Sequence, residues 1–300
     1  MPASLLHPTA PALSPLCLGG STFGREIDEP AAFALMDHAR ARGITLFDTA
    51  ATYSAGVSER IVGAWLASRR PAPGTLTVAT KIYPPFTPEV IEAAVAASAG
   101  RLGVETIDLL YLHKWDSAVS TPATLGALDR LVRAGRVRAL GASNFTTDQL
   151  RTALALQREL GLAPFRALQN NHNLAVRDVD APLLALCAAH EVAIVTYSPL
   201  GGGFLTGKHR HGVQPGSRFD VSPGHQNVYF HPESERRLAH LAAVAARTGH
   251  PMPHLALAWA LHRPGIASVL IGGRAPAHLD QAFAALALDD PALFDELEAV

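Results

Sequence analysis

The 300-residue chain is poor in cysteine and in charge. Its two cysteines, Cys17 and Cys187, each lie within an apolar run, which argues against a disulfide framework and indicates buried free thiols in a reducing compartment. Lys and Arg number 25 and Asp and Glu number 26, so the formal net charge is -1. A nearly neutral chain creates no field that attracts nucleic acid or an anionic membrane. We therefore expect small-molecule partners, with no nucleic acid and no membrane.

The sequence also lacks long hydrophobic runs. No basic segment followed by an apolar stretch stands at the N-terminus, and no run of 18 apolar residues follows later. These features predict a cytoplasmic protein.

Hydrophobic residues are nevertheless abundant, at 48% of the chain against 17% charged residues. This composition predicts a single domain over residues 1–300 with a large core. From residue 43 onward, short β-branched and apolar runs alternate with longer stretches that have apolar residues at helical spacing. Such alternation is typical of repeated βα units around a parallel sheet, and eight units predict an α/β fold of the (β/α)8 TIM-barrel type.

We expect strands at residues 16–19, 44–47, 75–79, 107–112, 137–141, 165–169, 192–196 and 267–271. We expect helices at residues 30–42, 58–68, 88–102, 122–133, 147–159, 179–190, 233–248 and 276–286, with an additional helix at 254–262.

The segment 201–232 is too long for an ordinary connection and is rich in Gly, His and Pro. Its composition predicts a functional lid or binding loop that buries too little apolar surface to order fully without a ligand. Its histidines have spacings that fit no compact metal site, so we expect them to be solvated and expect no metal.

Four polar residues lie where the active site of such a barrel forms. Asp48, Lys81 and His113 come at or just past the ends of predicted strands, and Tyr53 follows soon after Asp48. A phenol with a pKa near ~10 protonates a carbonyl oxygen during reduction only if a cation such as Lys81 stabilises its anion. A buried lysine keeps its proton beside a carboxylate such as Asp48. His113 can then orient the substrate oxygen by a hydrogen bond.

Residues 43–59, GITLFDTAATYSAGVSE, resemble the aldo-keto reductase signature around its catalytic Asp and Tyr. Residues 78–81, 108–113, 135–145 and 197–200 resemble the next family motifs in the right order, so the resemblance covers nearly the whole chain. The wider likeness is to bacterial members and to the branch of the channel-associated β-subunits. It implies hydride transfer between a nicotinamide cofactor and a carbonyl or alcohol, with four catalytic residues, Asp48, Tyr53 as proton donor, Lys81 and His113.

The resemblance also implies that NADP(H) binds across the barrel mouth without a Rossmann domain. Matching family positions would hold the nicotinamide with Ser143, Asn144, Gln169 and Tyr197, the pyrophosphate with Ser198, Leu200 and Lys208, and the adenosine end with Arg218, Gly272, Arg274 and His278. NADP(H) is the preferred cofactor. NAD(H) stays possible because Ala282 replaces the Asn usual in the family.

Three aromatic residues, Phe23, Tyr83 and Trp115, follow strand ends and are candidates for the substrate pocket. The substrate is expected to be an aldehyde or ketone, or a sugar or keto-sugar. Two alternatives stay open, an NAD-dependent sugar or alcohol dehydrogenase and a regulatory subunit that holds the cofactor but turns over slowly.

Overall fold

The computed structural model describes residues 6–300. Eight parallel strands form one closed barrel in sequence order, which confirms the (β/α)8 fold. The strands are β1 (Leu16–Gly19), β2 (Leu46–Asp48), β3 (Thr77–Ile82), β4 (Ile107–Leu112), β5 (Val137–Ser143), β6 (Phe165–Asn171), β7 (Ala193–Tyr197) and β8 (Ser268–Gly272). The barrel closes where β1 pairs with β8, with Leu16 opposite Val269.

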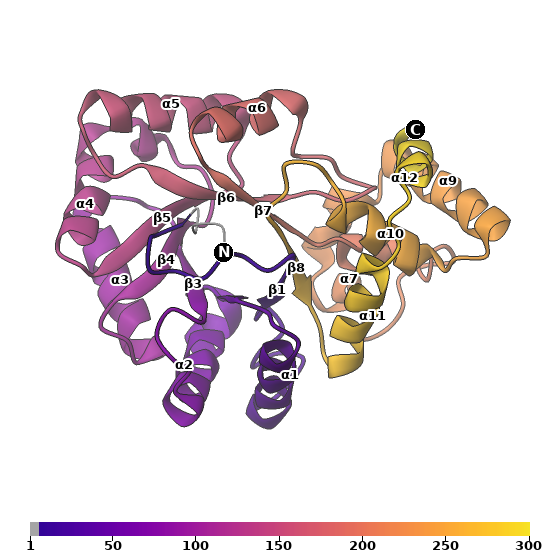
Figure 1. Ribbon diagram of the computed structural model, residues 1–300, viewed down its shortest axis with the longest axis horizontal. Helices are drawn as coiled ribbons and strands as arrows, with labels where there is room; N and C mark the ends of the chain where they lie inside the picture. Colours follow the sequence, from indigo (N-terminus) through magenta and orange to yellow (C-terminus); the bar gives the residue numbers. More distant parts are fainter. Residues whose placement is uncertain (1–5) are drawn as a thin grey trace.

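Helices surround the barrel in chain order, as Figure 1 shows. The first six are α1 (Glu29–Ala41), α2 (Val57–Arg69), α3 (Pro88–Leu102), α4 (Pro122–Arg133), α5 (Thr147–Glu159) and α6 (Ala181–Ala189). The chain then builds the lobe at the right of Figure 1 from α9 (Pro232–Thr248), α10 (Met252–Leu261), α11 (Pro276–Leu286) and α12 (Pro291–Glu298). Helix α10 is the additional helix expected before the last strand, whereas α12 was not expected.

The bounds predicted for the third strand, residues 75–79, are wrong at both ends, because β3 begins at Thr77 and continues through Lys81 to Ile82. Lys81 was expected just past the end of the strand. Lys81 can stay in register opposite Tyr111 of β4 because its ammonium is paired inside the barrel. A charged residue with a buried partner is thus compatible with a central strand.

One large ring fills the barrel interior. Tyr111 is fully buried there among small side chains, which include Ala79, Ala139 and Ala167. A Cβ added to Gly141 would lie 2.4 Å from the Tyr111 ring, so the glycine makes room for it. The interior is therefore a packed core, and the open space lies at its mouth.

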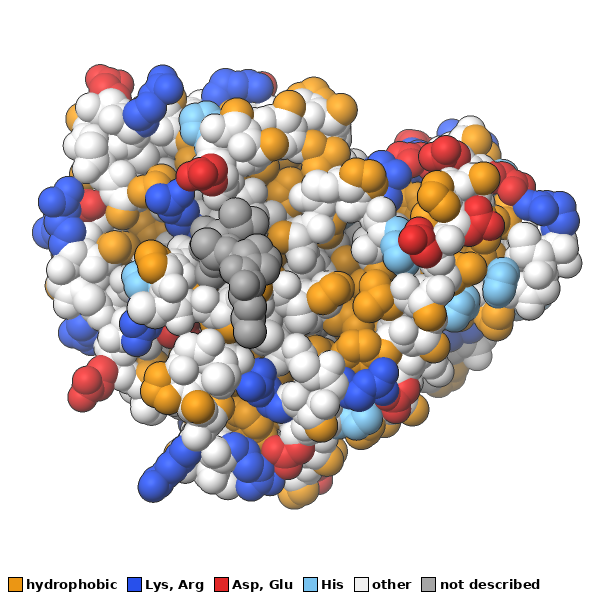
Figure 2. Space-filling model, viewed as in Figure 1, with side chains coloured by type: hydrophobic (Ala, Val, Ile, Leu, Met, Phe, Trp, Pro, Cys, Tyr) orange, Lys and Arg blue, Asp and Glu red, His pale blue; other side chains and the backbone are white. Residues whose placement is uncertain are grey.

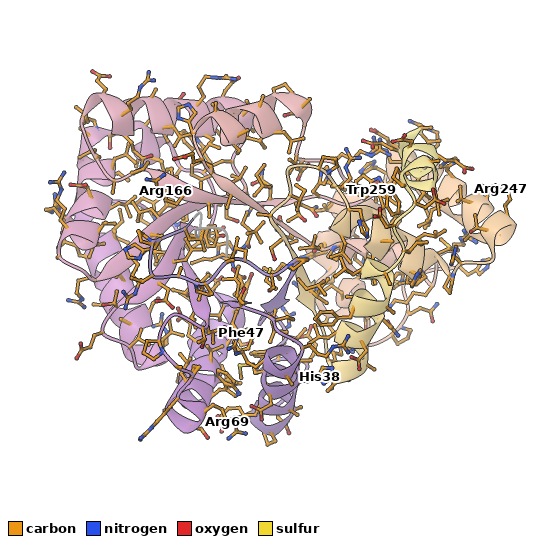
Figure 3. All side chains as sticks on the ribbon, viewed as in Figure 1. His38, Phe47, Arg69, Arg166, Arg247 and Trp259 are labelled. Carbon is orange, nitrogen blue, oxygen red and sulfur yellow. The ribbon has the colours of Figure 1, made fainter. Side chains whose placement is uncertain are left out.

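Aromatic contacts join the barrel to two helices, and Figure 3 labels one residue of each contact, Phe47 and Trp259. Phe47 of β2 meets Trp65 of α2 edge-on, with ring centroids 5.2 Å apart. Trp259 of α10 stacks on His172, which directly follows β6, at a centroid distance of 5.3 Å. These contacts fix α2 and α10 against the barrel.

Short helices and an aromatic cluster form in the segment after β7, and neither was expected from the sequence. It forms η3 (Gly201–Thr206), α7 (Arg218–Val221), η4 (Pro223–His225) and α8 (Gln226–Tyr229). Five rings pack together within it, from Phe204, His209, Phe219, Tyr229 and Phe230. The expectation that it buries too little apolar surface was wrong, because its aromatic residues come together only in three dimensions.

Charges of both signs are interspersed over the face shown in Figure 2, as a formal net charge of -1 would suggest. Within residues 6–300, no helix combines the length and the apolar character needed to cross a membrane.

Candidate active site

A cavity of about 950 Å³ opens at the carboxyl ends of the strands. Most residues expected at the site line it, including Asp48, Tyr53, Tyr83, His113, Ser143, Asn144, Gln169, Tyr197, Ser198, Leu200, Lys208, Arg218, Gly272, Arg274 and His278. Lys81 lies just beneath its floor, with 1% of its surface exposed.

Lys81 and Asp48 form a buried ion pair. The Lys81 ammonium donates to Asp48 Oδ1, to the Thr49 carbonyl at 2.9 Å and to the Tyr53 hydroxyl at 3.4 Å. Burial lowers the pKa of Lys81, but the Asp48 carboxylate and the Tyr53 hydroxyl together outweigh this effect, and the net pKa is raised. The ammonium is thus charged and points at the phenol.

Tyr53 follows β2 in the short helix η1 (Tyr53–Gly56) and is held close to Lys81. Burial raises the pKa of its hydroxyl, and the Lys81 ammonium opposes this effect. The phenol therefore keeps its proton at neutral pH, which a proton donor requires.

His113, directly after β4, is neutral in this environment. Burial and the Lys81 ammonium together lower its pKa to about 3. Its ring contacts Tyr53 and Tyr83 edge-on at centroid distances of 5.8 and 5.9 Å. A neutral imidazole beside the Tyr53 hydroxyl can hydrogen-bond a substrate oxygen without competing as an acid.

The depressed pKa of His113 predicts a loss of stability in acid. Below pH 6.5 the unfolded chain binds a proton on this residue that the folded protein does not bind until about pH 3. Stability therefore falls as pH falls, by up to about 2 kcal/mol between pH 8 and pH 5 for this group. Urea unfolding of wild type and His113→Asn at both pH values measures it. The variant should lose correspondingly less, and an equal loss in both proteins would assign the effect to other groups.

Amide and hydroxyl groups gather next to the ion pair. Gln169 Nε2 donates to Asp48 Oδ2 at 2.8 Å, and Ser143 Oγ donates to the Gln169 carbonyl at 2.9 Å. Asn144 adopts a positive φ of 60°, donates to the His113 carbonyl and accepts from the Tyr197 hydroxyl at 2.6 Å. This end of the cavity offers donors and acceptors beside an aromatic ring, a set suited to a flat amide-bearing group.

Three cations also line the cavity, Lys208, Arg218 and Arg274. Lys208 lies against Gly203, where an added Cβ would approach its Nζ to 3.3 Å, so the glycine leaves room for the ammonium. Farther along, Arg218 lies 3.6 Å from Glu26 and Arg274 donates to the Gly216 carbonyl at 3.0 Å. Three positive groups thus border one cavity, which favours a ligand with several anionic groups.

Three sequence expectations fail in the structure. Phe23 lies in the core with 1% exposure and does not line the cavity. Trp115 also lies off the cavity wall, since it packs edge-on against Phe145 at 5.1 Å. His209, expected to be solvated, is 5% exposed and packs against Phe219. In each case the ring packs against a neighbouring apolar surface.

Other lining residues were missed by the sequence analysis. Thr22 donates to the Gly273 carbonyl at 2.9 Å, while Glu26 and Gln281 also line the cavity. Thr22 follows the end of β1 by three residues, so its strand-end position could have marked it, whereas Glu26 lies farther along the β1–α1 connection. Within residues 6–300, no three His, Cys, Asp or Glu side chains lie together in a way that could hold a metal ion.

Comparisons with known proteins identify the family of this chain. Residues 15–297 match the sequence model of the aldo/keto reductase family. Norsolorinic acid reductase B of Dothistroma septosporum is 31% identical, over 98% of this chain and 80% of its own length. The enzyme of the same name from Aspergillus parasiticus is 31% identical (89% and 75%), and an aryl-alcohol dehydrogenase of Pestalotiopsis microspora is 29% identical (95% and 78%). The chain belongs to the aldo/keto reductase family.

Proposed function

We propose that this protein reduces aldehydes or ketones with NADPH and that Tyr53 is the proton donor. The observation that carries the proposal is the Lys81 ammonium, which lies 3.4 Å from the Tyr53 hydroxyl and is anchored by the buried Asp48 carboxylate. A cation in this place stabilises a phenolate and therefore makes the phenol a better acid when the proton leaves.

The residues divide the work between them. His113 Nε2 or Nδ1 hydrogen-bonds the carbonyl oxygen of the substrate, and Tyr53 donates its proton to that oxygen as negative charge develops. Lys81 stabilises the resulting phenolate, while Asp48 keeps Lys81 charged. The reduced cofactor supplies the hydride when it is bound.

The cavity fits a dinucleotide by the chemistry of its lining. Ser143, Asn144 and Gln169 would hold the carboxamide of the nicotinamide, and Tyr197 would pack on its ring. The Lys208 ammonium, in the space that Gly203 leaves open, would meet the pyrophosphate together with Ser198 and Leu200. Arg218, Gly272, Arg274 and His278 line the end where the 2′-phosphate would bind.

The substrate class that fits best is an aryl aldehyde or ketone. Tyr83 is 47% exposed at the cavity rim, where its ring contacts His113, and it offers an aromatic wall beside one of the reacting groups. One relative is named for an aryl alcohol. Sugars and keto-sugars are the alternative substrates.

A panel of carbonyl compounds tests the function directly. NADPH oxidation would be followed with substituted benzaldehydes, aliphatic aldehydes of similar size, and aldose sugars. We expect the highest kcat/KM for the aryl compounds. In a Tyr83→Leu variant, the ratio of kcat/KM for aryl over aliphatic aldehydes should become smaller. If the wild-type protein binds NADPH tightly but turns over none of these carbonyl compounds, the result would support the slow regulatory subunit instead.

Arg274 should decide the choice between cofactors. Arg274→Ala removes a guanidinium that only the 2′-phosphate of NADP(H) would engage, and a charge-assisted contact of this kind contributes about 1.5–3 kcal/mol. We expect the Kd of NADPH to rise roughly 10- to 100-fold, with the Kd of NADH almost unchanged. Calorimetric titration of both cofactors measures this. An equal loss for both would mean that Arg274 acts by holding the Gly216 carbonyl.

A further inference from the structure

Glu59 is a fully buried carboxylate that has no place in the proposed proton transfer. It lies in the first turn of α2 with 0% of its surface exposed. Thr80 Oγ1 donates to its Oε1 at 2.5 Å, and Arg101 Nε donates to its Oε2 at 2.6 Å. Burial of a carboxylate is unfavourable unless both oxygens have partners, and here the two partners come from different elements, β3 and α3.

The first partner lies beside the catalytic ammonium. Thr80 directly precedes Lys81 in β3, and side chains alternate along a strand, so Lys81 points inward while Thr80 points outward to Glu59. The Glu59–Thr80 hydrogen bond therefore holds β3 at the residue next to Lys81.

The second partner lies beside the turn that carries the phenol. Tyr53 is followed by three residues with positive φ, Ser54 at 48°, Ala55 at 53° and Gly56 at 82°. A Cβ on Gly56 would lie 2.7 Å from Arg101 Cδ, so the Arg101 side chain packs directly against this turn. Non-glycine residues in this region are strained and persist only where their surroundings hold them.

We infer that Glu59 is a positioning residue, which ties the Tyr53 turn to β3 and so fixes the phenol beside the Lys81 ammonium. The inference rests on the proposed roles of Tyr53 and Lys81. One carboxylate makes both connections, through Arg101 to the turn and through Thr80 to the strand. Without it, each group would keep its own anchors but lose the link that sets their separation of 3.4 Å.

Three variants break the link at different points. Glu59→Gln presents an NH2 group to one of two donors, Thr80→Val removes one hydrogen bond with little change of shape, and Arg101→Met removes the other connection. For each we expect kcat to fall about 10- to 100-fold with KM changed less than about threefold. The acid dissociation constant of the Tyr53 hydroxyl should fall about tenfold, which is a higher pKa, because the ammonium that stabilises the phenolate moves away.

The Tyr53 ionisation can be read without turnover. Tyrosine labelled with ¹³C at Cζ reports the titration by NMR, and the Tyr53→Phe spectrum assigns the resonance. Asp129→Asn is the matched control, because Asp129 is a buried carboxylate on α4 that also accepts from an arginine, Arg133 Nε at 2.6 Å. It should lower Tm as Glu59→Gln does and leave both kcat and the Tyr53 titration unchanged.

The outcomes separate positioning from mere support of the fold. If Glu59→Gln and Thr80→Val lower Tm but leave kcat and the Tyr53 titration at wild-type values, Glu59 only stabilises the fold and the inference is wrong. A wild-type protein that reduces no carbonyl compound would overturn the proposed function alone. The shift of the Tyr53 titration would still test the link.

Discussion

Tyr53→Phe should reduce turnover by about a thousandfold, within the range of 10²- to 10⁴-fold that general acid catalysis contributes. The phenyl ring keeps its edge-on contact with His113, and Lys81 keeps Asp48 and the Thr49 carbonyl as partners. Only the proton and its oxygen are lost. The Kd of NADPH, measured by calorimetry, should therefore stay within about a factor of two of wild type.

The control for this variant is Tyr229→Phe. Tyr229 is a buried tyrosine whose hydroxyl donates to Asn171 at 3.2 Å, and the residue does not line the cavity. It should keep turnover within about threefold of wild type. If Tyr53→Phe turns over as fast as Tyr229→Phe, another group donates the proton and the assigned role of Tyr53 is wrong.

The barrel could be predicted from the sequence because its signals are local. Short apolar runs and helical spacing repeat along the chain, and the structure confirms the closed barrel of eight strands. Polar residues at strand ends also marked the cavity, since parallel strands bring their carboxyl ends to one mouth. The bounds of β3 could not be predicted in this way, because Lys81 is accommodated within the strand only through its ion pair with Asp48 of β2.

The sequence could not predict which surface each side chain packs against. Phe23 and Trp115 stand beside strand ends as Tyr83 does, yet only Tyr83 reaches the cavity, since the other two rings pack against the core. Glu59 lies inside the segment that resembles the family signature, but nothing local shows that Thr80 and Arg101 are its partners. Such contacts join residues far apart in sequence, and periodicity does not report them.

Lys81→Met should have the largest combined effect, on both turnover and stability. The phenolate loses its stabilising cation, so turnover should fall by at least a hundredfold. Asp48 would remain buried without a counter-charge, and removal of one partner of a buried ion pair costs about 3–5 kcal/mol. Urea unfolding at pH 7 measures this loss, and the same preparations give kcat.

A second substitution separates the two effects. In Lys81→Met with Asp48→Asn no charge is left buried, so much of the lost stability should return while turnover stays low. The stability deficit of Lys81→Met alone should also shrink as pH falls. Burial raises the pKa of Asp48 and Lys81 opposes this, so without Lys81 the folded state still holds a proton on Asp48 at pH values where the unfolded chain has already released it. If the double variant instead regains turnover with its stability, the Lys81 charge takes no part in the reaction and serves only to neutralise Asp48.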